Sequence, residues 1–323
     1  MSSLREIKRP VTEELAAFQK VFKNAVKTKV PLLDVIMRYI LKAKGKQMRP
    51  MVVIYSAKLF GEVNESTYRA ATLVELMHTA TLVHDDVVDE SMQRRGRFSI
   101  NALWRNKIAV LVGDYLLSRG LLVALEHKEY SMLEIVSKAV KQMSEGELLQ
   151  IEKARKLDIK EDIYYEIIRK KTASLLASCF AAGAASSAKD ADIEKMRQIG
   201  EYAGMAFQIK DDLFDFVKGN STGKPSGIDI KEKKMTLPLI YALGQVSSSE
   251  KRKMIQVVKR YNTDQKKVEW LMETVSASGG IRYSTEKMLE FKNKSIDLLH
   301  EFSDNQARQA LEQLIEYTIE RKK

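Results

Sequence analysis

Residues 73–89 read LVELMHTATLVHDDVVD. Apolar side chains recur there three and four positions apart, which is the spacing of one face of an α-helix. Residues 32–40 and 296–319 repeat this spacing, and no proline occurs between Pro50 and Pro225. Runs of alternating apolar and polar residues bounded by turn dipeptides, which would indicate strands, are not found. We therefore predict an all-α fold.

Working outward from this segment, the chain reads as a succession of helices separated by short breaks. The loop over residues 219–235, GNSTGKPSGIDIKEKKM, is the longest irregular stretch. No shift in composition divides the chain, so we expect one domain over residues 1–323. Helices are predicted over residues 12–27, 31–42, 50–60, 66–90, 100–125, 130–152, 161–187, 190–217, 236–245, 250–260, 265–277 and 281–320.

The composition is typical of a globular protein that forms a large core. The chain has 323 residues, of which 45% are apolar and 30% are charged. One cysteine, Cys179, allows no internal disulfide, and the first ten residues, MSSLREIKRP, resemble no signal peptide. The longest uncharged stretch, residues 172–188, is shorter than the ~20 apolar residues that span a membrane. We expect a soluble, cytoplasmic protein.

The net charge of +11 lies mainly in the two flanks of the chain. Residues 1–84 carry +7 and residues 218–323 carry +6, whereas residues 85–217 carry −2. Positive charge in the flanks would attract nucleic acid, an anionic membrane or phosphorylated molecules. Most lysines on helices, however, simply face solvent. Residues 20–49 hold nine basic residues and one acid. They lack the aromatic context of a nucleic-acid site, and a weaker hypothesis is peripheral contact with an anionic membrane.

One aspartate motif occurs twice within the predicted helices. Asp85-Asp86-Val87-Val88-Asp89 is followed 126 residues later by Asp211-Asp212-Leu213-Phe214-Asp215. Helix geometry puts positions i and i+4 on one face, where like charges repel. Each motif follows an apolar stripe, so a cation is needed to compensate its carboxylates. Oxygen ligands favour Mg²⁺, which also binds substrate phosphates. We predict metal binding by Asp85, Asp86, Asp89, Asp211 and Asp215, with a diphosphate held between the two motifs.

Basic and polar residues near these motifs are candidates for binding that diphosphate. Lys46 and Arg49 flank a helix start, which also attracts anions. His78 lies two turns before Asp85, although a lone helical histidine is more often a core residue. The remaining candidates follow the first motif or surround the second; they are Arg94, Arg95, Lys171, Thr172, Gln208, Lys224 and Lys234.

At these residues the sequence resembles the trans-isoprenyl diphosphate synthases, also called polyprenyl synthetases, over essentially the whole chain. The matching text is GKQMRP at 45–50, LMHTATLVHDDVVDESMQRRG at 76–96, KKTASLL at 170–176, FQIKDDLFDF at 207–216 and GKPSGIDIKEKKMTLPLI at 223–240. The resemblance implies a large orthogonal helical bundle with a central substrate cavity, usually a homodimer. It also implies condensation of isopentenyl diphosphate with an allylic diphosphate such as farnesyl diphosphate.

The resemblance also assigns roles to the candidate residues. The aspartate motifs would bind three Mg²⁺ and the allylic diphosphate, with Asp85, Asp89, Asp211, Arg94 and Lys171 as the catalytic set and Lys224 assisting. Isopentenyl diphosphate would be held by Lys46, Arg49, His78 and Arg95. Thr172, Gln208 and Lys234 would support the allylic site. Two departures from the family pattern occur: Lys44 and Gln47 stand where a glycine and an arginine are usual, and Glu232-Lys233-Lys234 replaces Glu-Gly-Lys.

Product length can be argued from the helix before the first motif. Ala80 and Thr81 lie about one turn deeper than Asp85 on the same face, so they should form a wall of the tail pocket. Bulky aromatics at these positions stop chain growth early in the family. The small side chains of Ala80 and Thr81 therefore predict a long product of about thirty to fifty carbons.

Three alternatives remain. The first is a short-chain synthase that makes farnesyl or geranylgeranyl diphosphate. A terpene or squalene-type synthase would usually carry a different second metal motif and would not need Lys46 and Arg49. A non-catalytic subunit of a heteromeric synthase would be expected to have degraded aspartate motifs, whereas both motifs are intact.

Overall fold

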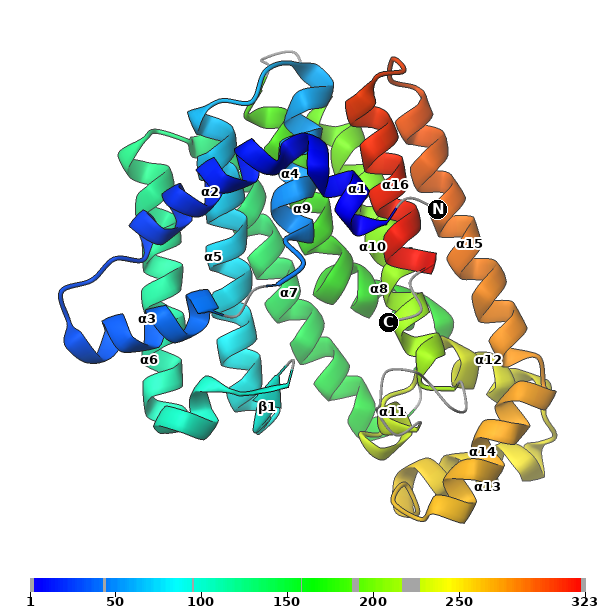
Figure 1. Ribbon diagram of the computed structural model, residues 1–323. Helices are drawn as coiled ribbons and strands as arrows, with labels where there is room; N and C mark the ends of the chain where they lie inside the picture. Colours follow the sequence, from blue (N-terminus) through cyan, green and yellow to red (C-terminus); the bar gives the residue numbers. More distant parts are fainter. Residues whose placement is uncertain are drawn as a thin grey trace. The chain divides into compact units, whose positions relative to one another are not determined.

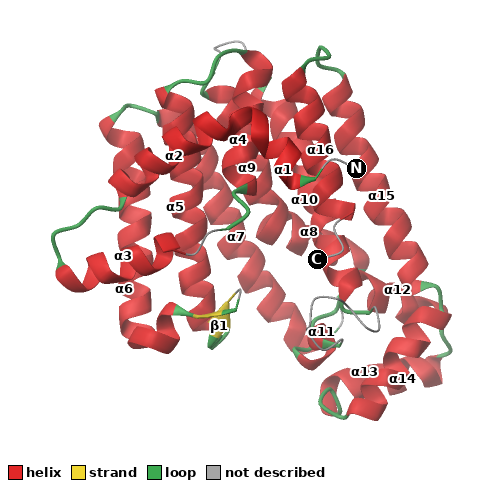
Figure 2. Cartoon of the chain, viewed as in Figure 1, coloured by secondary structure: helices red, strands yellow, loops and turns green. Residues whose placement is uncertain are grey.

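The computed structural model of the protein describes residues 3–42, 45–94, 96–157, 159–187, 192–216 and 227–320. Within these ranges the regular structure is helical, apart from one short antiparallel hairpin of two strands. Figure 2 shows how completely helix dominates the chain. The predicted all-α fold class is confirmed.

The chain divides into two compact units. Unit 1 comprises Met1–Val140, Ala177–Arg197 and Phe302–Leu314, and unit 2 comprises Lys141–Leu176, Gln198–Glu301 and Ile315–Lys323. Each unit is described by itself below. The single domain over residues 1–323, with its central cavity, stays a prediction.

Unit 1 is built largely from the first half of the chain. Its elements are α1 (Leu4–Lys8), the 3₁₀ turn η1 (Arg9–Val11), α2 (Thr12–Ala25), α3 (Pro31–Lys42), α4 (Met48–Phe60), α5 (Glu65–Val88), β1 (Gln93–Arg94), β2 (Arg97–Phe98), α6 (Ile100–Glu126), the start of α7 (Tyr130–Lys156), most of α9 (Ser174–Ala185) and the first turns of α16 (Gln306–Glu320).

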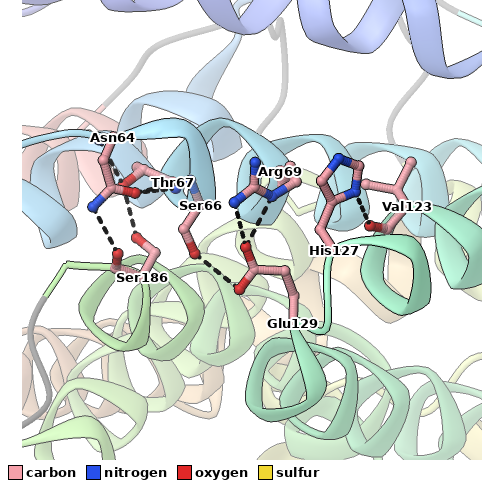
Figure 3. Close-up of polar contacts among 8 residues, drawn as sticks. All are labelled: Asn64, Ser66, Thr67, Arg69, Val123, His127, Glu129 and Ser186. Carbon is pink, nitrogen blue, oxygen red and sulfur yellow. Dashed lines mark hydrogen bonds and ion pairs between the residues drawn. The ribbon is translucent and has the colours of Figure 1, made fainter.

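Helix α5 is the central element of unit 1, where it packs against α2, α4 and α6 (Figure 1). Its first turn is anchored by side chains, as Figure 3 shows. Asn64 caps the helix and donates to the Ser186 carbonyl at 3.1 Å, while Arg69 pairs with Glu129 at 2.6 Å. These contacts hold α5 at the end opposite to the aspartate motif, ~35 Å away along the axis.

Helices α5 and α6 pack closely because glycines on α6 face large side chains on α5. A Cβ added to Gly113 would lie 2.1 Å from the His84 ring, and one on Gly120 would lie 2.8 Å from Met77. The two helices enclose an apolar core that includes Leu76, Ala80, Val83, Ala109, Val112 and Leu116. This contact sets the direction in which the end of α5 points.

Unit 2 holds the second aspartate motif. Its elements are the rest of α7, α8 (Glu161–Ile168), the π-helical segment η2 (Arg169–Ala173), most of α10 (Ile193–Phe214), α11 (Ile228–Lys231), α12 (Leu237–Gln245), α13 (Ser248–Arg260), α14 (Gln265–Ala277) and α15 (Gly280–His300). The apolar helix α12 packs against α8, α14 and α15 and is the buried centre of this unit.

Three predicted helices are interrupted in the structure. The helix expected over residues 100–125 kinks at Arg105, whose φ of 69° is not helical. The helix expected over residues 161–187 widens into the π-helical turn η2, a feature that side-chain spacing does not reveal. The helix expected over residues 281–320 breaks after His300, and Asn305 starts the next helix by accepting from the Arg308 N–H at 2.9 Å. The other predicted ranges match described helices to within a few residues, except that α1 and α11 were missed.

Candidate active site

The first aspartate motif forms the last turn of α5. Asp89 is the C-cap residue, and its N–H donates to the Asp85 carbonyl at 2.8 Å, so the two aspartates lie one turn apart as predicted. Asp86 points inward and is buried, and it accepts from Arg94 Nε at 2.7 Å. Burial raises the pKa of Asp86, although the Arg94 guanidinium acts against this shift. Asp86 therefore ties the hairpin to α5.

The hairpin β1–β2 presents Arg94 and is clamped to α3. The Tyr39 hydroxyl donates to the Phe98 carbonyl at 2.6 Å, and the Arg97 guanidinium lies 4.3 Å from the Tyr39 ring centre. Arg95 lies outside the described residues. The clamp and the Asp86 contact together fix where the Arg94 side chain lies.

A cavity of about 470 Å³ lies within unit 1, beside the first motif. His78, Asp86 and Arg94 line it, together with Gln47 from the loop before α4. Lys46 is exposed in that loop, and Arg49 is half-buried in the first turn of α4. The structure thus brings His78 and Arg94 to one cavity, and it places Lys46 and Arg49 next to residues that line it.

The second aspartate motif ends α10 and is held by a buried hydrogen-bond network. Asp212 accepts from the Tyr164 hydroxyl at 2.7 Å and from Gln208 Nε2 at 2.8 Å. Thr172 Oγ1 donates to the other end of the same amide, Gln208 Oε1, at 2.7 Å. Burial, followed by the nearby charge of Asp229, raises the pKa of Asp212 to about 7.

The two outer aspartates of this motif lie in different surroundings. Asp215 accepts from the backbone N–H groups of Ile228 at 2.8 Å and Asp229 at 3.1 Å, so it caps α11. Burial raises the pKa of Asp215 despite these hydrogen bonds. Asp211 is half-buried on the last full turn of α10.

A cavity of about 190 Å³ within unit 2 collects four predicted residues, namely Lys171, Thr172, Gln208 and Lys234. Lys171 pairs with Glu147 at 2.5 Å, and its ammonium also donates to Gln150 at 3.1 Å. Lys234 pairs with Glu232 at 2.5 Å and lies 3.7 Å from Asp229. Lys224 lies outside the described residues.

The predicted chain-length residues lie in the C-terminal third of α5. Ala80 is fully buried in the core that α5 shares with α6, and the half-buried Thr81 donates to the His78 carbonyl at 2.9 Å. Their neighbours Thr79, Leu82 and Val83 line the cavity of unit 1. Their role as a wall for the product tail stays a prediction.

The aspartate side chains fit a hard divalent cation in the chemistry of their donors. Asp85, Asp89 and Asp211 offer carboxylate oxygens, and Mg²⁺ takes few protein ligands because it keeps waters and binds substrate phosphates. Among the described residues, no three His, Cys, Asp or Glu side chains are grouped closely enough to hold a metal ion by themselves. Metal binding by Asp85, Asp86, Asp89, Asp211 and Asp215 stays a prediction.

Sequence reasoning missed several residues that the structure brings to these cavities. Tyr164 carries no motif, and only its burial beside Asp212 identifies it. Asp229 lies inside the quoted GKPSGIDIKEKKM text, yet no role was predicted for it; burial raises its pKa to about 6 against the opposing effect of Lys234. Lys8, far from every motif, lines the cavity of unit 1.

The model of the polyprenyl synthetase family matches residues 30–275. Among curated proteins, the chain is 34% identical to the all-trans-nonaprenyl-diphosphate synthase (geranyl-diphosphate specific) of Rhodobacter capsulatus, over 98% of both chains. It is 32% identical to the octaprenyl diphosphate synthase of Escherichia coli, over 99% of both chains.

Solved structures show the same fold. A decaprenyl diphosphate synthase from Rhodobacter capsulatus matches with a TM-score of 0.92 at 32% identity, over 98% of this chain and 99% of that one. A polyprenyl synthase from Caulobacter crescentus, complexed with calcium and isoprenyl diphosphate, matches with a TM-score of 0.90 at 31% identity, over 99% and 98%. A geranylgeranyl pyrophosphate synthase from Bacteroides thetaiotaomicron matches with a TM-score of 0.82 at 36% identity, over 98% of both chains.

Proposed function

The chain belongs to the polyprenyl synthetase family, and from this premise we propose that it is a Mg²⁺-dependent trans-polyprenyl diphosphate synthase. It condenses isopentenyl diphosphate with an allylic diphosphate such as farnesyl diphosphate. The product lies in the medium to long range, as the names of the octaprenyl and nonaprenyl relatives suggest.

The observation that carries this proposal is that each aspartate motif lies beside a cavity lined by the cationic and polar groups expected for a diphosphate. His78 and Arg94 line the first cavity, and Lys171 and Lys234 line the second. Cations are the protein groups that stabilise a charged leaving group.

The reaction needs no nucleophile from the protein. The allylic C–O bond breaks, and its electron pair leaves with the diphosphate. The double bond of isopentenyl diphosphate attacks the resulting carbocation, and loss of one proton to the released diphosphate restores a double bond. Bound Mg²⁺ would supply charge neutralisation for the departing diphosphate; its proposed ligands are Asp85, Asp86 and Asp89 of the first motif and Asp211 and Asp215 of the second.

The chain's own residues bind and position the reactants. Arg94, at the cavity of unit 1, and Lys171, at the cavity of unit 2, are each cations that can donate a charge-assisted hydrogen bond to a phosphate oxygen. Thr172 and Gln208 hold Asp212 in a fixed orientation through their shared hydrogen bonds.

Substitution of the two leading aspartates tests the assignment. We expect Asp85→Ala and Asp211→Ala each to lower turnover by at least about a hundredfold, because each removes a proposed carboxylate ligand of the Mg²⁺ that neutralises the leaving group. Circular dichroism should show unchanged helix content. Asp297→Ala, an exposed aspartate on α15, is the matched control and should retain full activity. Near-normal activity in either test variant would show that the metal assignment is wrong.

We also propose that the enzyme is a homodimer that pairs through α6. One face of this helix packs in the core with α5, while the other exposes Leu103, Val110, Leu111, Leu121, Leu122 and Leu125. By length and composition alone α6 could cross a membrane, but the same test is passed by core helices. Packing of a second copy of the chain against the exposed face of α6 would explain why this face is apolar.

The compartment and membrane contact are further proposals. We place the enzyme in the cytoplasm, since its single cysteine allows no internal disulfide. Exposed Lys27 and Lys29 lie beside exposed Val30 and Leu32 at the start of α3, which favours peripheral contact with an anionic membrane. Absence of binding to acidic liposomes in a sedimentation assay would refute the membrane contact.

A short-chain synthase is the second candidate function. The similarity to a structure described as a geranylgeranyl pyrophosphate synthase favours it. The small side chains at Ala80 and Thr81 argue for a longer product. The non-catalytic subunit would be excluded by product formation from the purified chain alone.

A further inference from the structure

Lys8 is the feature of unit 1 that neither the motifs nor the family match explains. It is the last residue of α1, and its ammonium donates to Gln47 Oε1 at 2.5 Å. Both residues line the cavity that also contains His78 and Arg94. A cation from the start of the chain thus lies at the wall of the first-motif cavity.

The position of Lys8 is fixed by the preceding residue. Ile7 is buried, and its carbonyl accepts from the Tyr55 hydroxyl at 2.5 Å. Tyr55 is itself buried in the middle of α4, and the side chain of Ser3 caps α1. The N-terminal helix is therefore held against α4, and the direction of Lys8 is set by the packed core rather than by a loose tail.

The charge of Lys8 remains available to a ligand. Its hydrogen-bond partner is a neutral amide rather than a carboxylate, so the positive charge is not cancelled within this contact. Gln47 also precedes the first turn of α4, whose free N–H groups favour an anion at the same place. Lys46 and Arg49 flank this point in the sequence.

We propose that Lys8 is an additional binding residue for the diphosphate of isopentenyl diphosphate. It supplies, from another part of the chain, the positive charge that Gln47 lacks. A lysine ammonium is a compact donor that suits phosphate oxygens, and the amide of Gln47 orients it toward the cavity. This inference rests on the proposed function, because it names one more residue of that substrate site.

Direct binding measurements test the proposal. Isothermal titration of isopentenyl diphosphate, without an allylic substrate, is made on the wild type, Lys8→Met and Lys8→Arg. Methionine keeps the length and apolar stem of the side chain but removes the charge. We expect Lys8→Met to raise Kd about tenfold, the effect of losing one charge-assisted hydrogen bond, and Lys8→Arg to stay within about threefold.

Two further variants separate a binding role from a structural one. Arg5→Met removes one exposed charge from the same helix and should leave Kd within about twofold of the wild type. The double variant Lys8→Met/Gln47→Lys returns a cation to the cavity and should recover most of the lost affinity. If Lys8 served only to stabilise the fold, Gln47→Lys would not restore the affinity for isopentenyl diphosphate.

The outcomes separate a failure of the proposed function from a failure of the role of Lys8. If the wild type binds no isopentenyl diphosphate, the proposed function fails. If the wild type binds it and Lys8→Met binds equally well, the function stands and the role of Lys8 is overturned. Weaker binding that Gln47→Lys does not restore also overturns it.

Discussion

At the scale of single residues, Cys179 shows how burial controls reactivity. It is fully buried in α9, and burial raises the pKa of its thiol to about 12. Since the thiolate is the reactive form, at pH 9 only about one thiol in a thousand would be ionised. We expect no measurable reaction of the native protein with a chromogenic disulfide reagent at pH 9, and reaction of one thiol per chain in guanidinium chloride. Rapid labelling of the native protein would contradict the burial.

Tyr164 provides a test of the network around the second motif. Tyr164→Phe removes the hydroxyl that donates to Asp212 and leaves the buried ring in place. We expect kcat to fall about tenfold, because the carboxylate loses a partner that orients it. The neighbouring Tyr165→Phe removes a hydroxyl bonded to Glu161 instead, and it should keep kcat within about twofold. Equal values of kcat for the two variants in steady-state assays would contradict a specific role of the Tyr164 hydroxyl at Asp212.

Much of the candidate site could be predicted at this scale, but not its supporting contacts. The spacing of Asp85 and Asp89 was enough to place them one turn apart, because helix geometry is local. Tyr164 and Lys8 could not be found in this way, since their partners lie 48 and 39 residues away in the sequence. Such contacts depend on tertiary packing, which no local pattern encodes.

At the scale of elements, the contact between α4 and α9 depends on Gly183. A Cβ at this position would lie 2.4 Å from the Val53 carbonyl oxygen, so Gly183→Ala must push the two helices apart. We expect the free energy of unfolding to fall by about 1–3 kcal/mol, measured by urea denaturation. Gly244→Ala on α12 meets nothing within 4 Å and should be neutral or slightly stabilising. A neutral Gly183→Ala would contradict this packing.

Helix α5 also carries the prediction about product length. Ala80→Phe places a ring one turn below Asp85, where it should narrow the tail pocket and shorten the product. The residue is fully buried, so circular dichroism and thermal melting must confirm that the variant folds. Chromatography of the dephosphorylated products measures the chain length. An unchanged product distribution from a folded variant would remove Ala80 from the wall.

The elements themselves were predictable where a periodic apolar face is long. The ranges of α3 and α5 follow from that spacing over residues 32–40 and 73–89. The π-helical turn η2 and the non-helical Arg105 inside α6, at φ 69°, were not predictable. Both are local departures from α-helical geometry, which the spacing of apolar side chains does not reveal.

At the scale of the whole molecule, the exposed face of α6 predicts the oligomeric state. The double variant Leu111→Glu/Leu122→Glu places charges on this face and should convert a dimer into a monomer, because buried unpaired charges are costly. Light scattering after size-exclusion chromatography measures the mass. Leu289→Glu, an exposed leucine on α15, is the control and should leave the mass unchanged. A dimer that survives the double variant would place the interface elsewhere.

One incubation tests the central claim most directly. The purified wild-type chain is incubated with radiolabelled isopentenyl diphosphate, farnesyl diphosphate and Mg²⁺, and the dephosphorylated products are separated by reversed-phase chromatography. The account predicts Mg²⁺-dependent incorporation into prenyl chains several isoprene units longer than the primer. Absence of incorporation by the folded, Mg²⁺-supplied protein would contradict it.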